Sequence, residues 1–318
     1  MTLPPAILVA GPTASGKSAL ALALASRLGG TIVNTDSMQV YRELRVLTAR
    51  PTVAEEASVP HALYGVRPAA EAGSAAWWRA AALEAMAGSW NAGRVPILTG
   101  GTGMYFAALT QGLADVPDPG AAARAEARTL LHDHGPEVLH ASLMKVDPAT
   151  AARFDPHDGQ RIARAWEVWR GTGMGLAAWQ NRKLPPAPWR FTAIRLDPPR
   201  DVLRAAIATR FAAMARDGAI EEVKALLALD LDPALPAMRA HGVPELSAWL
   251  GGTMTLEEAG RRVELVTGQY TKRQATWFRH HPLTDSGDPE IIESRFSHNT
   301  QLSESLYAKI FAFIQKRD

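Results

Sequence analysis

The alternation of short apolar runs with longer helical stretches predicts an α/β protein. Runs of strand length lie at residues 6–10, 31–35, 95–99 and 191–196. Stretches of helical composition or periodicity lie at residues 19–25, 75–90, 201–216, 219–229 and 256–278. Strands that alternate with helices in this way form a parallel sheet flanked by helices. We therefore expect a doubly covered parallel sheet as the core of the protein.

Two turn-rich passages, at residues 116–120 and 184–188, interrupt this pattern. Between them Ile162, Trp166 and Trp169 recur at i, i+4 and i+7, on one face of a helix. The expected parts are a discontinuous core (1–112 and 190–285), an inserted all-helical domain (113–189), and a tail that ends in a helix (286–318).

Composition narrows the class of protein. The 318 residues are 47% hydrophobic, which supports a substantial buried core. The chain has no cysteine, so disulfides and thiolate zinc sites are excluded. With a formal net charge of +2, any RNA-binding surface must be local. No run is long enough to span a membrane and the first residues do not resemble a signal peptide, so we expect a cytoplasmic protein.

Residues 11–18, Gly-Pro-Thr-Ala-Ser-Gly-Lys-Ser, match the phosphate-binding loop G-x-x-x-x-G-K-[ST] at every specified position. The loop joins a predicted strand to a predicted helix, a setting typical of the sheet of P-loop NTPases, where backbone N–H groups and the helix N-terminus bind phosphate. The predicted phosphate-binding residues are Gly11, Thr13, Ala14, Ser15, Gly16, Lys17 and Ser18. The Ser18 hydroxyl can also bind Mg²⁺, the one metal we expect. By itself such a loop predicts nucleotide binding, ATP in particular.

Polar residues at two further strand ends point to the same crevice. Asp36 follows the run at 31–35, and Thr102 lies in the glycine turn after the run at 95–99. In an open parallel sheet, ligands bind beyond the carboxyl ends of the strands. Asp36 could therefore bind Mg²⁺ through water or accept a proton, although Asp-Ser after a strand is equally an ordinary helix N-cap.

A second acidic strand end, as ATP hydrolysis requires, is not evident. Asp197 follows the run at 191–196 but is succeeded by two prolines, and Asp230 continues a helix. This weakens the ATPase interpretation and admits a diphosphate that is not part of a nucleotide.

Two basic features have both functional and structural interpretations. Arg210 lies in an otherwise apolar helix, where it could stabilise a leaving diphosphate or belong to a surface with Arg204 and Arg216. Residues 269–281 combine three fixed positive charges with three aromatics and no acid, as single-stranded RNA recognition requires. A helix with a solvated basic face and buried Tyr270, Trp277 and Phe278 would have the same pattern.

Taken together, these segments resemble the tRNA dimethylallyltransferase family, also called tRNA isopentenyltransferases. The resemblance rests on GPTASGKS (11–18), NTDSMQVYR (34–42), TARP (48–51), GGTGMY (100–105), QRIARAWEV (160–168), GAIEEV (218–223) and QYTKRQATWFR (269–279). With no cysteine there is no zinc-finger extension, so the bacterial type is indicated. The tail from about residue 286 has no counterpart in the resemblance.

The resemblance implies transfer of a dimethylallyl group from dimethylallyl diphosphate to N6 of the adenosine immediately 3′ of the anticodon. It assigns the general base to Asp36, a contact with the flipped adenosine to Thr102 and a diphosphate contact to Arg210. Extruding the base makes physical sense, because a stacked adenine cannot present its amine to a buried carbon. Mg²⁺ is the implied cofactor, and a monomer is expected.

The resemblance also implies contacts with the tRNA anticodon stem-loop. These fall on Asp36, Ser37, Met38, Gln39, Thr102, Arg124, Gln160, Arg161, Ile162, Ala163, Arg164, Arg239, His241, Gly242, Lys272, Arg273, Gln274, Thr276, Trp277 and Arg279. The sequence departs from many relatives at Val243, where they carry tyrosine. Two alternatives remain open: a P-loop small-molecule kinase, which would turn over ATP, and a noncatalytic RNA-binding protein that uses the loop as an anion site.

Overall fold

The computed structural model describes residues 3–284, 287–297, 300 and 303–315. The chain forms two compact units, which are described separately. The core unit comprises Met1–Thr110 and Ala187–Asp318, and the inserted unit comprises Gln111–Pro186.

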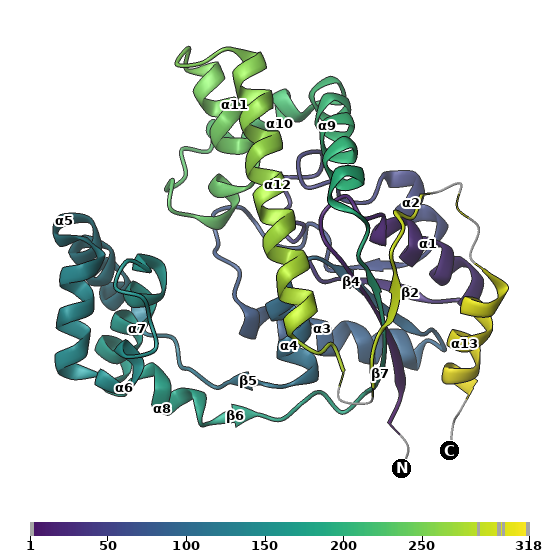
Figure 1. The fold of residues 1–318 in the computed structure, drawn as a ribbon, viewed down its shortest axis with the longest axis horizontal. Helices are drawn as coiled ribbons and strands as arrows, with labels where there is room; N and C mark the ends of the chain where they lie inside the picture. The colour runs from purple at the N-terminus through teal and green to yellow at the C-terminus, as the bar shows by residue number, and fades with distance from the viewer. Residues whose placement is uncertain (1–2, 285–286, 298–299, 301–302, 316–318) are drawn as a thin grey trace. The chain divides into compact units, whose positions relative to one another are not determined.

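A parallel sheet forms the centre of the core unit (Figure 1). It has six strands in the order β3-β2-β4-β1-β7-β8. The strands are β1 (Pro5–Ala10), β2 (Thr31–Asn34), β3 (His61–Ala62), β4 (Pro96–Gly100), β7 (Arg190–Leu196) and β8 (Glu290–Ile292). The ends of β2, β4 and β1 are thus adjacent, because these three strands are neighbours in the sheet. This confirms the predicted α/β class and the juxtaposition of the three polar strand ends.

Helices cover both faces of the sheet. The helices of the core unit are α1 (Lys17–Leu28), α2 (Val53–Ser58), α3 (Ala75–Asn91), α4 (Gly103–Thr110), α9 (Arg200–Arg216), α10 (Ala219–Leu227), α11 (Val243–Leu250), α12 (Leu256–His280) and α13 (Glu304–Gln315), with a 3₁₀ turn, η1, at Pro236–Arg239. Along β1, Leu8 packs with residues of α3, α4 and α12, whereas Ile7 and Val9 pack with residues of α1 and α13. Burial on both faces explains why β1 is apolar throughout rather than alternating.

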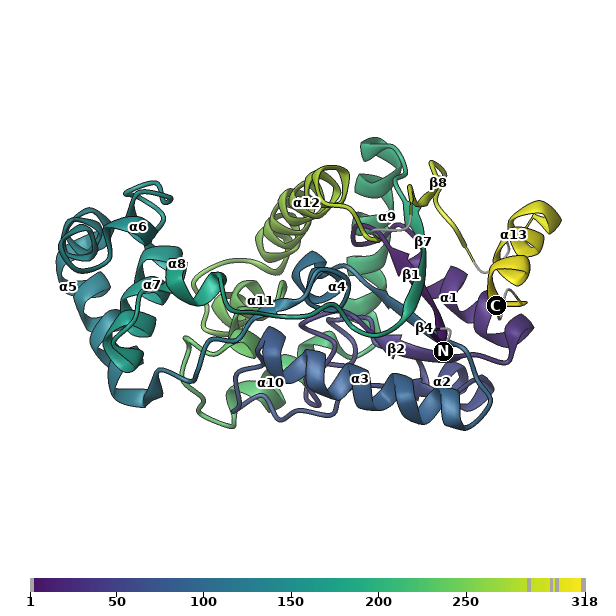
Figure 2. The same ribbon diagram turned by 90° about the horizontal axis from the view of Figure 1, so that it is seen from below.

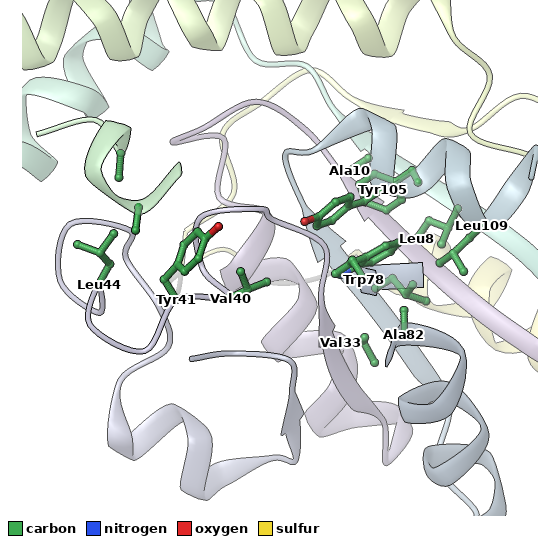
Figure 3. Close-up of a cluster of buried hydrophobic side chains, with 14 of the residues drawn as sticks. Leu8, Ala10, Val33, Val40, Tyr41, Leu44, Trp78, Ala82, Tyr105 and Leu109 are labelled. Carbon is green, nitrogen blue, oxygen red and sulfur yellow. The ribbon is translucent and has the colours of Figure 1, made fainter. Parts of the chain in front are cut away.

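An aromatic stack fixes the end of β2 on the first of these faces. The rings of Trp78 and Tyr105 are parallel, with centroids 4.3 Å apart, and lie beside Leu8 and Leu109 (Figure 3). The buried Trp78 indole donates a hydrogen bond of 2.9 Å to the carbonyl oxygen of Asn34. This contact holds the last residue of β2, two positions before Asp36, against α3.

The C-terminal segment differs from the expected tail. Strand β8 pairs with β7 in parallel, Ile194 lying opposite Glu290, so it extends the main sheet. Helix α13 buries Leu306 and Ile310 in the cluster that α1 supplies, and Figure 2 shows the two helices side by side. Strand β8 could not be predicted, because a run of three residues is too short to display a period of two.

The inserted unit is built mainly from helices. They are α5 (Gly120–Val146), α6 (Pro148–Ala151), α7 (Gly159–Thr172) and α8 (Leu176–Gln180). Helix α5 is broken at Gly135, whose backbone is not helical and which precedes Pro136. Two short strands, β5 (Leu113–Ala114) and β6 (Lys183–Leu184), pair antiparallel. The unit is therefore not entirely helical, which differs from the expected all-helical domain. A strand of two residues is too short to be predicted from a sequence pattern.

Candidate active site

The phosphate-binding loop has the backbone of an anion cradle. Gly16, which precedes α1, has φ of 92°, and Ala14 has φ of 66°. The Lys17 ammonium donates to the Pro12 carbonyl oxygen over 3.4 Å. Loss of hydration on burial lowers the pKa of Lys17 to about 8, an effect that the Asp36 carboxylate opposes and the nearby Arg210 reinforces. The loop therefore presents a cation beside the N-terminus of a helix.

Asp36 is positioned by its own strand rather than by a helix cap. The amide of the fully buried Asn34 donates to the carbonyl oxygens of Asp36 and Leu63 at 3.0 Å, and its oxygen accepts from the Asp36 N–H at 2.9 Å. The Asp36 carboxylate accepts a bond of 2.9 Å from the backbone N–H of Met38. One carboxylate oxygen is engaged in this turn, so the other can face a ligand.

Thr102 joins the neighbouring strand end to this turn. Its hydroxyl accepts a hydrogen bond of 2.9 Å from the Ser37 N–H and lies 3.3 Å from the Ser37 hydroxyl. The structure thus brings Asp36, Ser37 and Thr102 together, as expected from adjacent strand ends.

Gln274 connects helix α12 to both glycine turns. Its side-chain oxygen accepts hydrogen bonds from the Thr13 N–H at 2.8 Å and the Thr13 hydroxyl at 3.0 Å, while its nitrogen donates to the Gly101 carbonyl at 2.9 Å. A Cβ on Gly101 would lie 2.1 Å from that nitrogen, so only glycine permits this approach. Gln274 is only 4% exposed. Its amide therefore positions the phosphate loop, and the RNA contact implied for Gln274 stays a prediction.

One cavity, which we call the phosphate cavity, opens over the loop with a volume of about 440 Å³. Its lining includes Thr13, Lys17, Ser18, Asp36, Gln39 and Arg210. The Thr99 hydroxyl, buried at the end of β4, also faces it and has no hydrogen-bond partner among the described residues. An unpaired buried hydroxyl beside Lys17 and Arg210 fits an oxygen-rich anion and its hydrated cation.

Arg210 is part of this cavity rather than of a solvated surface. It extends from α9, and in the described part of the chain no carboxylate forms an ion pair with it. Burial lowers the pKa of Arg210, whereas the Asp36 carboxylate favours its charged form. An arginine that forms no ion pair with the described residues, in this place, suits an anionic ligand.

Neither acidic candidate for nucleotide hydrolysis lies in the phosphate cavity. Asp197 receives two hydrogen bonds of 3.0 Å from the Arg279 guanidinium, and Asp230 lies in the turn after α10. The second carboxylate in the cavity lining, Glu55, comes from helix α2 and not from a strand end, so it does not have the position of a Walker B residue.

A second cavity of about 300 Å³ lies beyond Asp36, and we call it the acceptor cavity. Its lining is largely apolar and aromatic, with basic residues at the rim: Met38, Leu47, Ile207, Phe211, Met214, Arg239, His241, Val263, Tyr270 and Arg273. The His241 and Tyr270 rings meet edge to face, with centroids 5.0 Å apart. Burial raises the pKa of Tyr270 to about 12, so its phenol stays neutral.

The two cavities share a wall. Thr13, Asp36, Thr48 and Arg210 line both of them. A carboxylate and a guanidinium therefore stand where a ligand in one cavity would meet a ligand in the other. This arrangement permits direct transfer of a group between two bound molecules.

The loop that closes this side of the site is held by α10. The Glu222 carboxylate accepts hydrogen bonds from the N–H groups of Arg45, Val46 and Leu47, over 2.7, 2.7 and 2.9 Å. Gln39 donates to the carbonyl oxygens of Thr48 and Ala49, at 2.8 and 2.9 Å. The side chains of Gln39 and Leu47 thus reach their cavities from a tied loop.

The predicted contact residues just before α11 and at its start differ in how deeply they are buried. Arg239 is exposed and His241 half-buried at the acceptor cavity. Gly242 is buried, and its N–H donates to the Glu245 carboxylate over 3.0 Å. Val243 is buried at 1% exposure, so valine here belongs to the core.

The basic segment of α12 has two faces. Lys272, Arg273, Thr276 and Arg279 are exposed, whereas Phe278 is buried. Trp277 is half-buried and its ring stacks on His281, with centroids 4.4 Å apart. The helix therefore has a basic outer face and an aromatic inner face, the pattern of the structural interpretation, while RNA recognition by the basic face stays a prediction. Arg279 is already paired with Asp197, so it has fewer donors to offer a ligand.

In the inserted unit most of the predicted RNA-binding residues lie on the surface. Gln160, Arg161 and Arg164 are exposed on α7, where Arg164 pairs with Glu167 at 2.7 Å. Arg124 of α5 pairs with Asp118. Ile162, however, is completely buried with Leu139 and Leu143 and Ala163 packs against the same cluster. The Ile162 side chain thus belongs to the core of this unit, and the RNA contact that the resemblance implies at this position stays a prediction.

Three contributors to the site were missed by the sequence analysis. Tyr270 lines the acceptor cavity, but the sequence could not distinguish this position from that of a core aromatic. Glu222 lies in the GAIEEV segment of the family resemblance, but that segment did not indicate that its carboxylate binds the backbone of residues 45–47. Arg295 lines the phosphate cavity from the C-terminal segment, where an isolated arginine gave no signal.

A phosphate loop on a parallel sheet, with a second cavity across a shared carboxylate, defines a P-loop-like α/β enzyme with two substrates. Within this class the chain belongs to the IPP transferase family, the prenyltransferases that modify tRNA. The IPP transferase family model matches residues 39–281, and that of the isopentenyl transferases matches residues 5–70.

Individual relatives agree with this assignment. The tRNA dimethylallyltransferase of Granulibacter bethesdensis is 60% identical over 98% of this chain and 98% of its own length. That of Gluconobacter oxydans is 59% identical over 100% of this chain and 96% of its own.

Solved structures are similar over the same span. The full-length tRNA isopentenylpyrophosphate transferase from Bacillus halodurans is 30% identical, with a TM-score of 0.67 over 98% of this chain and 96% of that chain. A eukaryotic dimethylallyltransferase acting on tRNA is 25% identical, with a TM-score of 0.83 over 99% of this chain and 80% of that chain. In the described residues no helix is long and apolar enough to cross a membrane.

Proposed function

We propose that this protein transfers the dimethylallyl group of dimethylallyl diphosphate to N6 of the adenosine immediately 3′ of the anticodon in tRNA. The observation that carries the proposal is the wall shared by the two cavities, which holds Asp36 and Arg210. The donor's diphosphate fits the phosphate cavity, with its charge met by Lys17 and Arg210. The apolar and aromatic lining of the acceptor cavity suits an extruded adenine and the prenyl chain.

The chemistry forms one bond and breaks one. N6 of adenine attacks the allylic C1, the C1–O bond breaks, and diphosphate leaves with the bonding electrons. Asp36 accepts the proton that N6 loses, while Arg210 and Lys17 stabilise charge on the departing oxygen. Thr102, bonded to Ser37, stands beside Asp36 to position the adenine.

We propose Mg²⁺ as the cofactor, with Ser18 as its ligand from the protein. The exposed Ser18 hydroxyl, the Asp36 carboxylate and the unpaired Thr99 hydroxyl line one cavity, and oxygen donors are what this ion prefers. When bound, the ion supplies charge neutralisation for diphosphate.

The exposed basic residues of α12 and α7 are proposed to bind the phosphates of the anticodon stem-loop.

The test is incubation with unmodified tRNA and radiolabelled dimethylallyl diphosphate, with labelled ATP in a parallel reaction. Label in tRNA supports the proposal, whereas ATP consumption without transfer would favour the kinase alternative.

Asp36→Asn should lower kcat by about 10²- to 10⁴-fold, the range for loss of a general base, and leave the Kd for tRNA within about twofold. Unchanged turnover in this variant would remove Asp36 as the base.

A further inference from the structure

The C-terminal segment passes directly over the phosphate-binding loop. The Phe296 N–H donates to the Ser15 carbonyl over 3.1 Å, and the Arg295 Nε donates to the Ala14 carbonyl over 3.0 Å. A Cβ on Gly16 would lie 1.9 Å from the Phe296 carbonyl oxygen. The second glycine of the loop motif is therefore required here for contact with the segment as well as for its φ of 92°.

The C-terminal segment is held in place on both sides of Arg295. Strand β8 ends three residues earlier and is paired with β7, so the chain enters from the sheet. The Phe296 side chain, 5% exposed, is buried among apolar residues of α1, including Leu20 and Leu24. Arg295 is thus held on a fixed backbone at the mouth of the phosphate cavity.

The Arg295 guanidinium retains free donors directed to that cavity. Its Nε is bonded to Ala14, and its two other nitrogens have no partner within the described ranges of the chain. It lines the phosphate cavity together with Lys17, Ser18 and Arg210. It is also close enough to Arg210 to help lower the pKa of that residue. Two guanidinium groups line one cavity, and neither forms an ion pair with a carboxylate of the described residues, an arrangement that suits an anionic ligand.

The charge of the lining leads to the same conclusion. The cavity is bordered by the cations Lys17, Arg50, Arg210 and Arg295 and by the carboxylates Asp36 and Glu55. Arg50 is directed to Glu56 and to the backbone carbonyls of Tyr41 and Arg42. The cationic excess therefore resides in Lys17, Arg210 and Arg295, which surround the loop.

We propose that Arg295 is a further binding residue for the diphosphate, contributed by the C-terminal segment. The two nitrogens not used by Ala14 donate to diphosphate oxygens in the phosphate cavity. The inference rests on the proposed function for the identity of the donor, but diphosphate recognition is testable without any transfer.

The test measures binding of inorganic diphosphate with Mg²⁺ by titration calorimetry on the full chain. Arg295→Gln keeps an N–H donor for the Ala14 carbonyl and removes the charge. We expect it to weaken diphosphate binding by about tenfold, as for loss of one charge-assisted hydrogen bond. The KM for dimethylallyl diphosphate should rise by a similar factor, with the KM for tRNA and the melting temperature unchanged.

Two further variants separate charge at the cavity from other effects. Lys309→Gln removes a positive charge from the exposed face of α13, where Lys309 pairs with Glu290, and should leave diphosphate affinity at the wild-type value. Arg295→Lys restores the charge and should recover part of the affinity. The proposal is overturned if Arg295→Gln binds diphosphate as tightly as the wild type, or if Arg295→Lys loses as much as Arg295→Gln. A wild-type protein that binds diphosphate but does not prenylate tRNA would overturn the proposed function alone.

Discussion

Lys17 is the cation of the phosphate cavity whose charge changes within the working pH range. Its pKa of about 8 in the folded protein lies below the ordinary value of 10.5 because burial penalises the ammonium. Below about pH 8 the ammonium is present and attracts diphosphate, and above that pH the neutral amine does not.

We expect kcat/KM for dimethylallyl diphosphate to fall above pH 8, approaching about tenfold per pH unit for loss of a single proton. This quantity reports the free enzyme, in which Lys17 has no diphosphate to hold its proton. Between its folded and unfolded pKa values Lys17 binds fewer protons in the folded state, so this group alone makes stability rise with pH. Loss of activity near pH 9 should therefore occur without a lower melting temperature.

Lys17→Arg provides the control for this pH profile. Arginine keeps its charge throughout the range, so the fall above pH 8 should disappear, whatever the activity that remains. A pH profile identical to that of the wild type would assign the titration to another group.

At the scale of elements, α12 both supports the phosphate loop and exposes a basic face. The inner residue Gln274 bonds to Thr13 and Gly101, whereas Lys272, Arg273 and Thr276 face solvent. One helix thus contacts the phosphate site with one face and offers the other to a ligand. Substitutions on the two faces should have different consequences.

Gln274→Leu should destabilise the protein by about 2–4 kcal/mol, because the buried Thr13 N–H and Gly101 carbonyl lose their partner. It should also weaken diphosphate binding, since the loop is no longer fixed. Chemical denaturation and calorimetry measure the two effects. Gln269→Leu, the same change at an exposed position of α12, should alter stability by less than about 0.5 kcal/mol. Equal effects of the two changes would contradict the positioning role of Gln274.

At the scale of the whole molecule, the inserted unit leaves and re-enters the core at adjacent points. The Ala187 N–H donates to the Leu109 carbonyl over 2.7 Å, so the two ends of the core chain are already joined by a hydrogen bond. The inserted unit has its own apolar cluster around Ile162 and Leu143. Its removal should leave the core sheet and both cavities intact.

Replacing residues 111–186 with a short Gly/Ser linker should give a folded protein that binds inorganic diphosphate with a Kd within about twofold of the wild type. Affinity for tRNA should fall by about tenfold or more, because the exposed arginines of α7 are lost. Calorimetry and filter binding measure the two affinities. A linked core that fails to fold, or that binds tRNA normally, would contradict this division of roles.

The sequence predicted the parts of the site that depend on local pattern. The loop, Asp36 and Thr102 follow strands of the main sheet, and strand ends in a parallel sheet meet at one edge. The arrangement around Gln274 could not be predicted, because it depends on a pairing of residues 261 positions apart. For Ile162, the i, i+4, i+7 pattern correctly indicated a buried face, whereas the RNA contact that the family motif implies there stays a prediction. Burial decides whether a motif residue can touch a ligand through its side chain.

The position of β8 at the outer edge of the sheet has a consequence for how the protein is made. The other five strands, the loop and α12 all precede β8 in the chain, so they leave the ribosome first. Until β8 follows, the edge of β7 exposes unpaired backbone groups, a known starting point for association between chains. During synthesis the nascent chain therefore passes through a stage in which it needs protection along β7, and only the later arrival of residues 290–296 ends it.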